Sequence, residues 1–88
     1  MGSTLAAAAI FNAKDSDALL DLGFAYSTGT RGMSIDLVSA HQWFNLAALA
    51  GSEEAQFCRA DIADQMSNRE IAEAQRRART WLASHATH

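Results

Sequence analysis

The sequence predicts an all-α fold of antiparallel helical hairpins. Its 88 residues include no proline, so no position forces a break in a helix. Alanine, the best helix former, is abundant, and the alternation of β-branched and aromatic residues typical of strands is absent. Apolar residues instead recur at helical spacing between short turns rich in glycine and serine.

Length and charge limit the class of protein. A chain of 88 residues makes one small domain, 1–88, and its formal charge of -3 argues against a nucleic-acid partner. No apolar run reaches the roughly 18 residues that a membrane helix needs. The segment "LAAAAIF" has no basic residue before it, so we expect no signal peptide. Cys58 is the only cysteine, which suits the cytoplasm, and we expect it to be a small buried hydrophobe.

The first half of the chain predicts three helices. We expect residues 4–13 to form a short alanine-rich helix, and Asp15 or Ser16 to cap a second helix over 16–28. The second helix has apolar residues on two sides, which places it between neighbours. These are Ala18, Leu19, Leu22 and Tyr26 on one side and Leu20 and Phe24 on the other. Glycines in "STGTRGMS" make a turn, and Asp36 then caps a helix that runs to about 50 and stops at Gly51.

The second half predicts two more helices. Ser52 caps a helix over 53–65, and Ser67 with Glu70 forms a capping box that opens a helix over 68–84. Each has one apolar stripe. The stripes are Ala55, Cys58, Ile62 and Met66, and then Ile71, Ala74, Ala78, Trp81 and Leu82. Because the connections are short, we expect sequential helices to be antiparallel neighbours.

Two large rings stand side by side at Trp43 and Phe44, among small residues. Adjacent residues on a helix point about 100° apart. We therefore expect one ring to pack on the preceding helix and the other on the following helix. Ala40, Ala47 and Ala48 are small enough to let these neighbours approach closely.

The chain also contains a partial internal repeat, since "ALLDLG" at 18–23 aligns with "AQFCRA" at 55–60. The stretch 18–54 resembles the Sel-1-like repeat, a relative of the tetratricopeptide repeat. The matching residues are Ala18, Leu22, Gly23, Tyr26, Gly29, Gly32, Asp36, Ala40, Trp43, Phe44, Ala47, Ala48 and Gly51. Met33 stands where the family usually has valine, and the glycine loop holds one extra residue.

The resemblance implies a short right-handed α-solenoid, a TPR-like α-α superhelix. Residues 4–13 would be a worn helix of a preceding repeat, 18–54 a full repeat, and 55–84 a degenerate terminal repeat or cap. Proteins of this family, commonly bacterial, are non-enzymatic scaffolds or adaptors for protein-protein interaction. The resemblance thus implies another protein as partner, bound on a face formed by first helices. We place that face at Asp21, Ala25, Cys58 and Ile62.

Two alternatives remain open. The chain holds one good repeat and parts of two others, whereas about three stacked repeats are usual for stability. "LAAAAIF" pairing with its copy in a homodimer would supply the missing packing. A small DNA-binding regulator is the remote alternative, because "QMSNREIAEAQRRA" resembles the second half of a helix-turn-helix.

The sequence offers no catalytic, cofactor or metal site. We expect His41, His85 and His88 to be solvent-exposed imidazoles, and Asp61 and Asp64 to lie on a solvated helix face. No nucleophile elbow, phosphate loop, dinucleotide fingerprint or zinc spacing occurs. The cluster of Arg76, Arg77 and Arg79 suits the polar outer face of a terminal repeat, with an anionic surface as the alternative.

Overall fold

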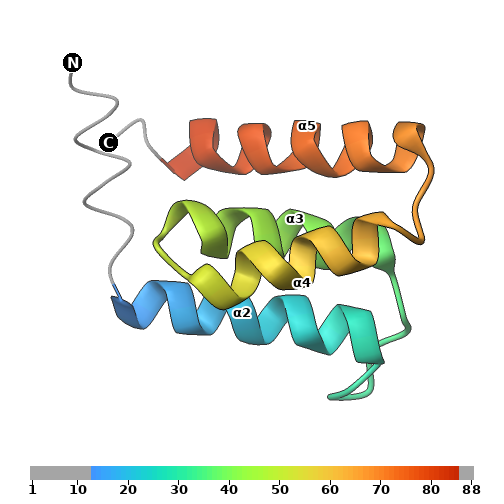
Figure 1. Cartoon of the computed structure of the whole chain (residues 1–88). Coiled ribbons are helices and arrows are strands. Elements are labelled where there is room, and N and C mark those ends of the chain that lie inside the picture. The colour runs from blue at the N-terminus through green and yellow to red at the C-terminus, as the bar shows by residue number, and fades with distance from the viewer. Residues whose placement is uncertain (1–12, 86–88) are drawn as a thin grey trace.

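The computed structural model describes residues 13–85, and this part of the chain is all-helical, without strands. It comprises α2 (Ala13–Thr28), α3 (Leu37–Leu49), α4 (Glu53–Ala63) and α5 (Asn68–His85). Consecutive helices run in alternating directions, as Figure 1 shows. The predicted all-α class is confirmed. The expected helix over 4–13 lies outside the described residues, apart from Ala13, which belongs to α2.

Helix α3 is the centre of the packing. It makes extensive contacts with α2, α4 and α5, and no other pair of described helices is in comparable contact. The buried core cluster consists of Leu19, Ala40, Phe44, Leu46, Ala47, Ala55, Ile62 and Ala78. Half of these residues come from α3. A helix with three neighbours needs small side chains on most of its surface, which explains its alanines.

The contact between α2 and α3 depends on Phe44. This side chain is fully buried, and its ring meets that of Phe24 edge to face, with centroids 5.4 Å apart. The ring also lies directly against Gly23, where an added Cβ would come within 2.5 Å of Phe44 Cε1. Gly23 is therefore required for the close approach of the two helices.

Trp43 packs differently from the expectation. Its ring lies edge to face with that of Trp81 on α5, with centroids 6.1 Å apart. Phe44 packs on the preceding helix as predicted, but the prediction that the other ring packs on the following helix is wrong. The side of α3 that faces α4 instead carries Asn45, whose amide Arg59 of α4 contacts. Because α3 has three neighbours, the adjacent position in sequence points to α5.

The predicted helix caps are mostly confirmed. Asp36 Oδ1 accepts from the backbone N–H of Ser39 at 3.1 Å, and Ser52 Oγ accepts from that of Ala55 at 3.1 Å. Ser67 N–H donates to Glu70 Oε1 at 2.8 Å while Glu70 N–H donates to Ser67 Oγ at 3.1 Å, which completes the capping box.

The start of α2 and the exposure of Ala18 differ from the prediction, whereas the end of α3 agrees with it. Asp15 and Ser16 do not cap α2, because the helix is already formed at Ala13, and alanine and lysine favour helix there. Gly51 follows the C-cap residue Ala50 with φ of +108°, a conformation that suits glycine. Ala18 is exposed, so it does not belong to the buried side of α2.

No helix within residues 13–85 combines the length and apolar content needed to cross a membrane.

The Gly23→Ala substitution tests the contact between α2 and α3. Alanine favours helix over glycine by about 1 kcal/mol, but overpacking a closed core costs about 1–3 kcal/mol. We expect net destabilisation, because the buried ring of Phe44 has no space into which to move. Urea denaturation followed by circular dichroism measures the change. Adding Phe44→Leu to Gly23→Ala should recover part of the loss. A variant as stable as the parent chain would contradict the close contact.

Candidate functional site

The four residues expected to form a partner-binding face do not form a surface. Ala25 is 1% exposed and Ile62 is 8% exposed, so both belong to the buried interior. Asp21 lies on the exposed side of α2, 3.8 Å from Arg31 Nη2, and Cys58 is half-buried on α4. The prediction is wrong for Ala25 and Ile62, because the apolar sides of α2 and α4 both turn inward.

The thiol of Cys58 is not arranged for reactivity. Burial raises its pKa, and the negative charges of Glu54 and Asp61 raise the pKa further. A thiol that stays protonated is a poor nucleophile and a poor metal ligand. Cys58 packs against the core cluster but is only half-buried, so the expected role of a small buried hydrophobe is met in part. Asp61 and Asp64 are exposed, as predicted.

His41 is buried, at 3% exposure, and the prediction that it is solvent-exposed is wrong. Within the described part of the chain its Nδ1 has no hydrogen-bond partner. Its helical neighbour Asn45 accepts a hydrogen bond from Arg59 Nη1 at 2.5 Å. Burial, and then the positive charge of Arg59, lowers the pKa of His41. The imidazole is therefore neutral at pH 7.

The other histidines were expected to be solvent-exposed, like His41. His85 is exposed, as predicted, and His88 lies outside the described residues. No three histidine, cysteine, aspartate or glutamate side chains within residues 13–85 come together in a group that could hold a metal ion.

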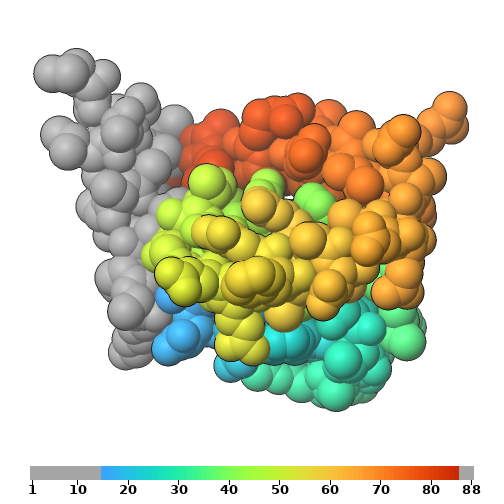
Figure 2. All heavy atoms as spheres, in the orientation of Figure 1, coloured from blue at the N-terminus to red at the C-terminus, as the bar shows by residue number. Residues whose placement is uncertain are grey.

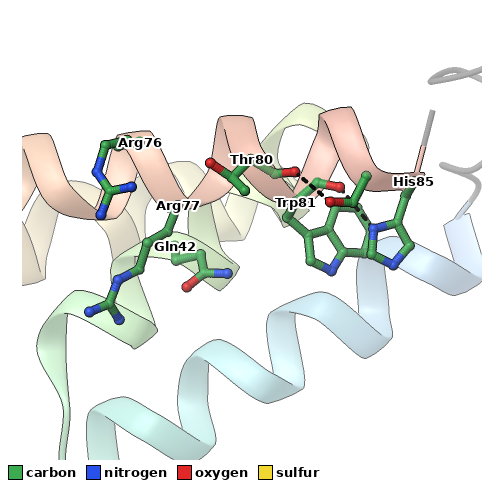
Figure 3. Close-up of a pocket in the computed structure, with 7 residues that line it drawn as sticks. Gln42, Arg76, Arg77, Thr80, Trp81 and His85 are labelled. Carbon is green, nitrogen blue, oxygen red and sulfur yellow. Dashed lines mark hydrogen bonds between the residues drawn. The ribbon is translucent and has the colours of Figure 1, made fainter. Parts of the chain in front are cut away.

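A shallow groove lies between α3 and α5, with a volume of about 340 Å³ (Figure 3). Its lining residues are Gln42 from α3 and Arg76, Arg77, Thr80, Trp81, Ser84 and His85 from α5. The groove thus combines guanidinium groups, aromatic rings, hydroxyls and one amide. Its α5 residues recur at helical spacing, so they share one side of that helix.

The rings of Trp81 and His85 form one end of the groove, next to each other as in Figure 3. They are stacked, with centroids 3.9 Å apart and planes inclined by 17°. His85 Nδ1 lies 2.8 Å from the carbonyl oxygen of Trp81, at hydrogen-bond distance. Trp43 of α3 packs edge to face on Trp81. This contact restricts the Trp81 ring, on which the His85 ring is stacked.

The arginines form the other end of the groove and share one carboxylate. Glu73 Oε2 lies 2.6 Å from Arg76 Nη2 and 2.8 Å from Arg77 Nε. Hydrogen bonds from Arg76 and then Arg77 lower the pKa of Glu73. Two cations against one anion leave a net positive charge. A second hollow of about 260 Å³, lined by Arg69, Ala72, Glu73 and Arg76, continues this charge along α5.

Arg77 also acts on the N-terminus of α3. Burial disfavours the ionised form of Asp36, but hydrogen bonds from the backbone and hydroxyl of Ser39, together with the charge of Arg77, hold its pKa below the ordinary value. The charge of Arg77 on α5 thus favours the ionised form of the carboxylate that caps α3.

The sequence alone did not identify this groove. Gln42, Thr80 and Ser84 belong to no recognisable motif, and the arginines were expected to be a solvated cap. The available signal was the run of Arg76 and Arg77 followed one turn later by Trp81. The side chains that line the groove can bind charge and stack on rings, and they include no carboxylate that could act as a general base.

No family model, no curated protein and no solved structure matches this chain. The resemblance to Sel-1-like repeats therefore stays a prediction from the motif residues.

The buried imidazole of His41 predicts loss of stability in mild acid. The pKa of His41 in the folded chain lies below the ordinary value of 6.5, so the unfolded chain takes up the proton first. Stability is thus fully present above about pH 6.5 and falls as the pH drops through the folded pKa. Urea denaturation midpoints at pH 7.5 and 5.5 measure the effect.

The control for this prediction is His41→Leu, which replaces the titrating ring by an apolar side chain. This variant should show a smaller difference between the two pH values than the parent chain. His85→Ala, at an exposed position on α5, should leave the parent difference in place. An unchanged pH dependence in His41→Leu would contradict the assignment.

Proposed function

We propose that this chain is a non-enzymatic protein-interaction module built from Sel-1-like repeats. Its docking site is the groove between α3 and α5, and its ligand is an acidic, aromatic-bearing segment of a partner protein. One observation carries the proposal: arginines and a stacked aromatic pair line the same hollow, from one side of one helix.

The local roles of the motif residues support the repeat assignment. Asp36 caps α3, Gly51 follows its C-terminus with positive φ, and Gly23 accommodates the ring of Phe44. Each of these positions needs the residue type that the family pattern has there. These residues cap α3, end it and allow its close contact with α2, as a helical hairpin over 18–54 requires.

The distribution of charge supports an acidic ligand. Four arginines against two glutamates give α5 a formal charge of +2, whereas the whole chain carries -3. The remainder of the chain thus carries -5. Guanidinium groups bind carboxylates through paired, charge-assisted hydrogen bonds, and the flat face of a stacked ring pair accepts another aromatic side chain. Arg77 and Trp81 are one helical turn apart on α5. A ligand helix with a carboxylate one turn from an aromatic residue has the same spacing.

Substitutions at Thr80, which is exposed in the middle of the groove, test the proposal. The probe is a fluorescein-labelled peptide EEAAFEEA, with KKAAFKKA as the matched control peptide. We expect Thr80→Glu to weaken binding of the acidic probe about tenfold, since one repulsive pair at close range costs about 1.4 kcal/mol. Thr80→Lys should bind at least as well as the parent. Fluorescence anisotropy measures both dissociation constants.

Glutamate and lysine are both good helix formers, so the two variants keep α5 intact and differ in charge alone. Binding of the acidic probe should also weaken as salt is raised, because the contact is exposed to solvent. Equal affinity for the two peptides, or equal binding by both Thr80 variants, would contradict the groove as the docking site.

A further inference from the structure

The outer side of α4 carries an aromatic residue that nothing in the described structure covers. Phe57 is 72% exposed, which is more than any other large hydrophobic residue among residues 13–85. In Figure 2 this side of the molecule shows α4, in yellow, in front of the other helices. A single exposed phenylalanine is common on protein surfaces. Phe57 differs because exposed acidic residues surround it on the same helix.

Carboxylates surround Phe57 on the same side of α4. Glu53, Glu54, Asp61 and Asp64 stand four before, three before, four after and seven after it, and all are exposed. Residues three and four apart are neighbours on a helix surface, and Asp64, the C-cap residue of α4, lies two turns further along the same side. Arg59, the only cation of α4, turns away from them and donates to Asn45 of α3. We call Phe57 and these four carboxylates the α4 face.

We propose that the α4 face of one copy docks into the groove between α3 and α5 of a second copy. The inference rests on the proposed function of the groove and identifies a partner that carries the required chemistry. The carboxylates of the α4 face oppose Arg76 and Arg77, and the ring of Phe57 meets the stacked rings of Trp81 and His85. Both halves of the contact are thus present on one chain.

Charge complementarity distinguishes the α4 face from the other exposed apolar residues. Ile35, in the loop before α3, and Leu49, at the end of α3, are 65% and 58% exposed, but neither has four carboxylates within seven residues of it in the sequence. The α4 face is acidic where the groove is basic, and each presents one aromatic element. Like charges would repel if two α4 faces or two grooves met, so the contact joins unlike surfaces.

The contact has a consequence for assembly. Since each copy contributes a different surface, the two surfaces can be disabled separately in different molecules. A molecule without a working α4 face still offers its groove, and a molecule without a working groove still offers its α4 face. Mixing the two therefore restores one contact.

The first measurement is sedimentation velocity of the full chain over a wide range of concentration, at low and high salt. We expect the weight-average mass to rise above the 9.5 kDa of the monomer as concentration increases. The rise should be smaller in high salt, because solvent-exposed charge pairs are screened.

The decisive measurement uses two variants, Phe57→Ala and Thr80→Glu. Each alone should remain monomeric at concentrations where the parent associates, and an equimolar mixture should form a dimer. Leu49→Ala is the matched control, because it removes another exposed apolar side chain, outside the α4 face, and should associate like the parent. Circular dichroism must show the parent helicity for all three variants. If Phe57→Ala does not, Phe57→Gln replaces it, because glutamine is also a good helix former and is polar.

The possible failures are distinct. A mixture that stays monomeric, or a Phe57→Ala variant that associates like the parent, overturns the docking of the α4 face. Association of Phe57→Ala like the parent is also the result expected if "LAAAAIF" pairs with its copy. A parent chain that stays monomeric but binds EEAAFEEA overturns the self-association and leaves the proposed function standing. A parent chain that does neither overturns both.

Discussion

The fold depends on the seating of the Phe44 ring against Gly23. This contact lets α2 and α3 approach more closely than any side chain at position 23 would allow, and it buries the largest ring of the core. Burial of one such aromatic stabilises the folded chain by roughly 2–3 kcal/mol, a large share for a domain of this size. The alanines of α3 then bring the other two helices close to the same axis.

Three neighbours around one short helix leave little surface for polar groups. His41 is buried on α3 with an unpartnered Nδ1 in the described part of the chain, close to the charge of Arg59. A buried polar atom without a hydrogen bond costs stability. The central helix thus accepts one unfavourable group, and its neutral form at pH 7 limits the cost.

The surface has a segregated charge distribution. Cations concentrate on α5, around a hollow that also holds two stacked rings, while carboxylates concentrate on the outer side of α4 around Phe57. The carboxylates around Phe57 are not needed for the core, because the buried residues of α4 lie on its other side. On α5, Trp81 both lines the groove and packs against the core cluster. This segregation of charge supports the proposed interaction module more directly than the repeat pattern does.

The sequence by itself determined the helical class, the four described helices within a few residues, and the caps at Asp36, Ser52 and Ser67, because these follow from local hydrogen bonds and helical periodicity. Only the tertiary structure decided that Trp43 meets α5, that His41 and Ile62 are buried, and that Gln42 joins residues of α5 in one groove. Periodicity shows which side of a helix is apolar. The neighbour that covers this side depends on packing among helices distant in sequence.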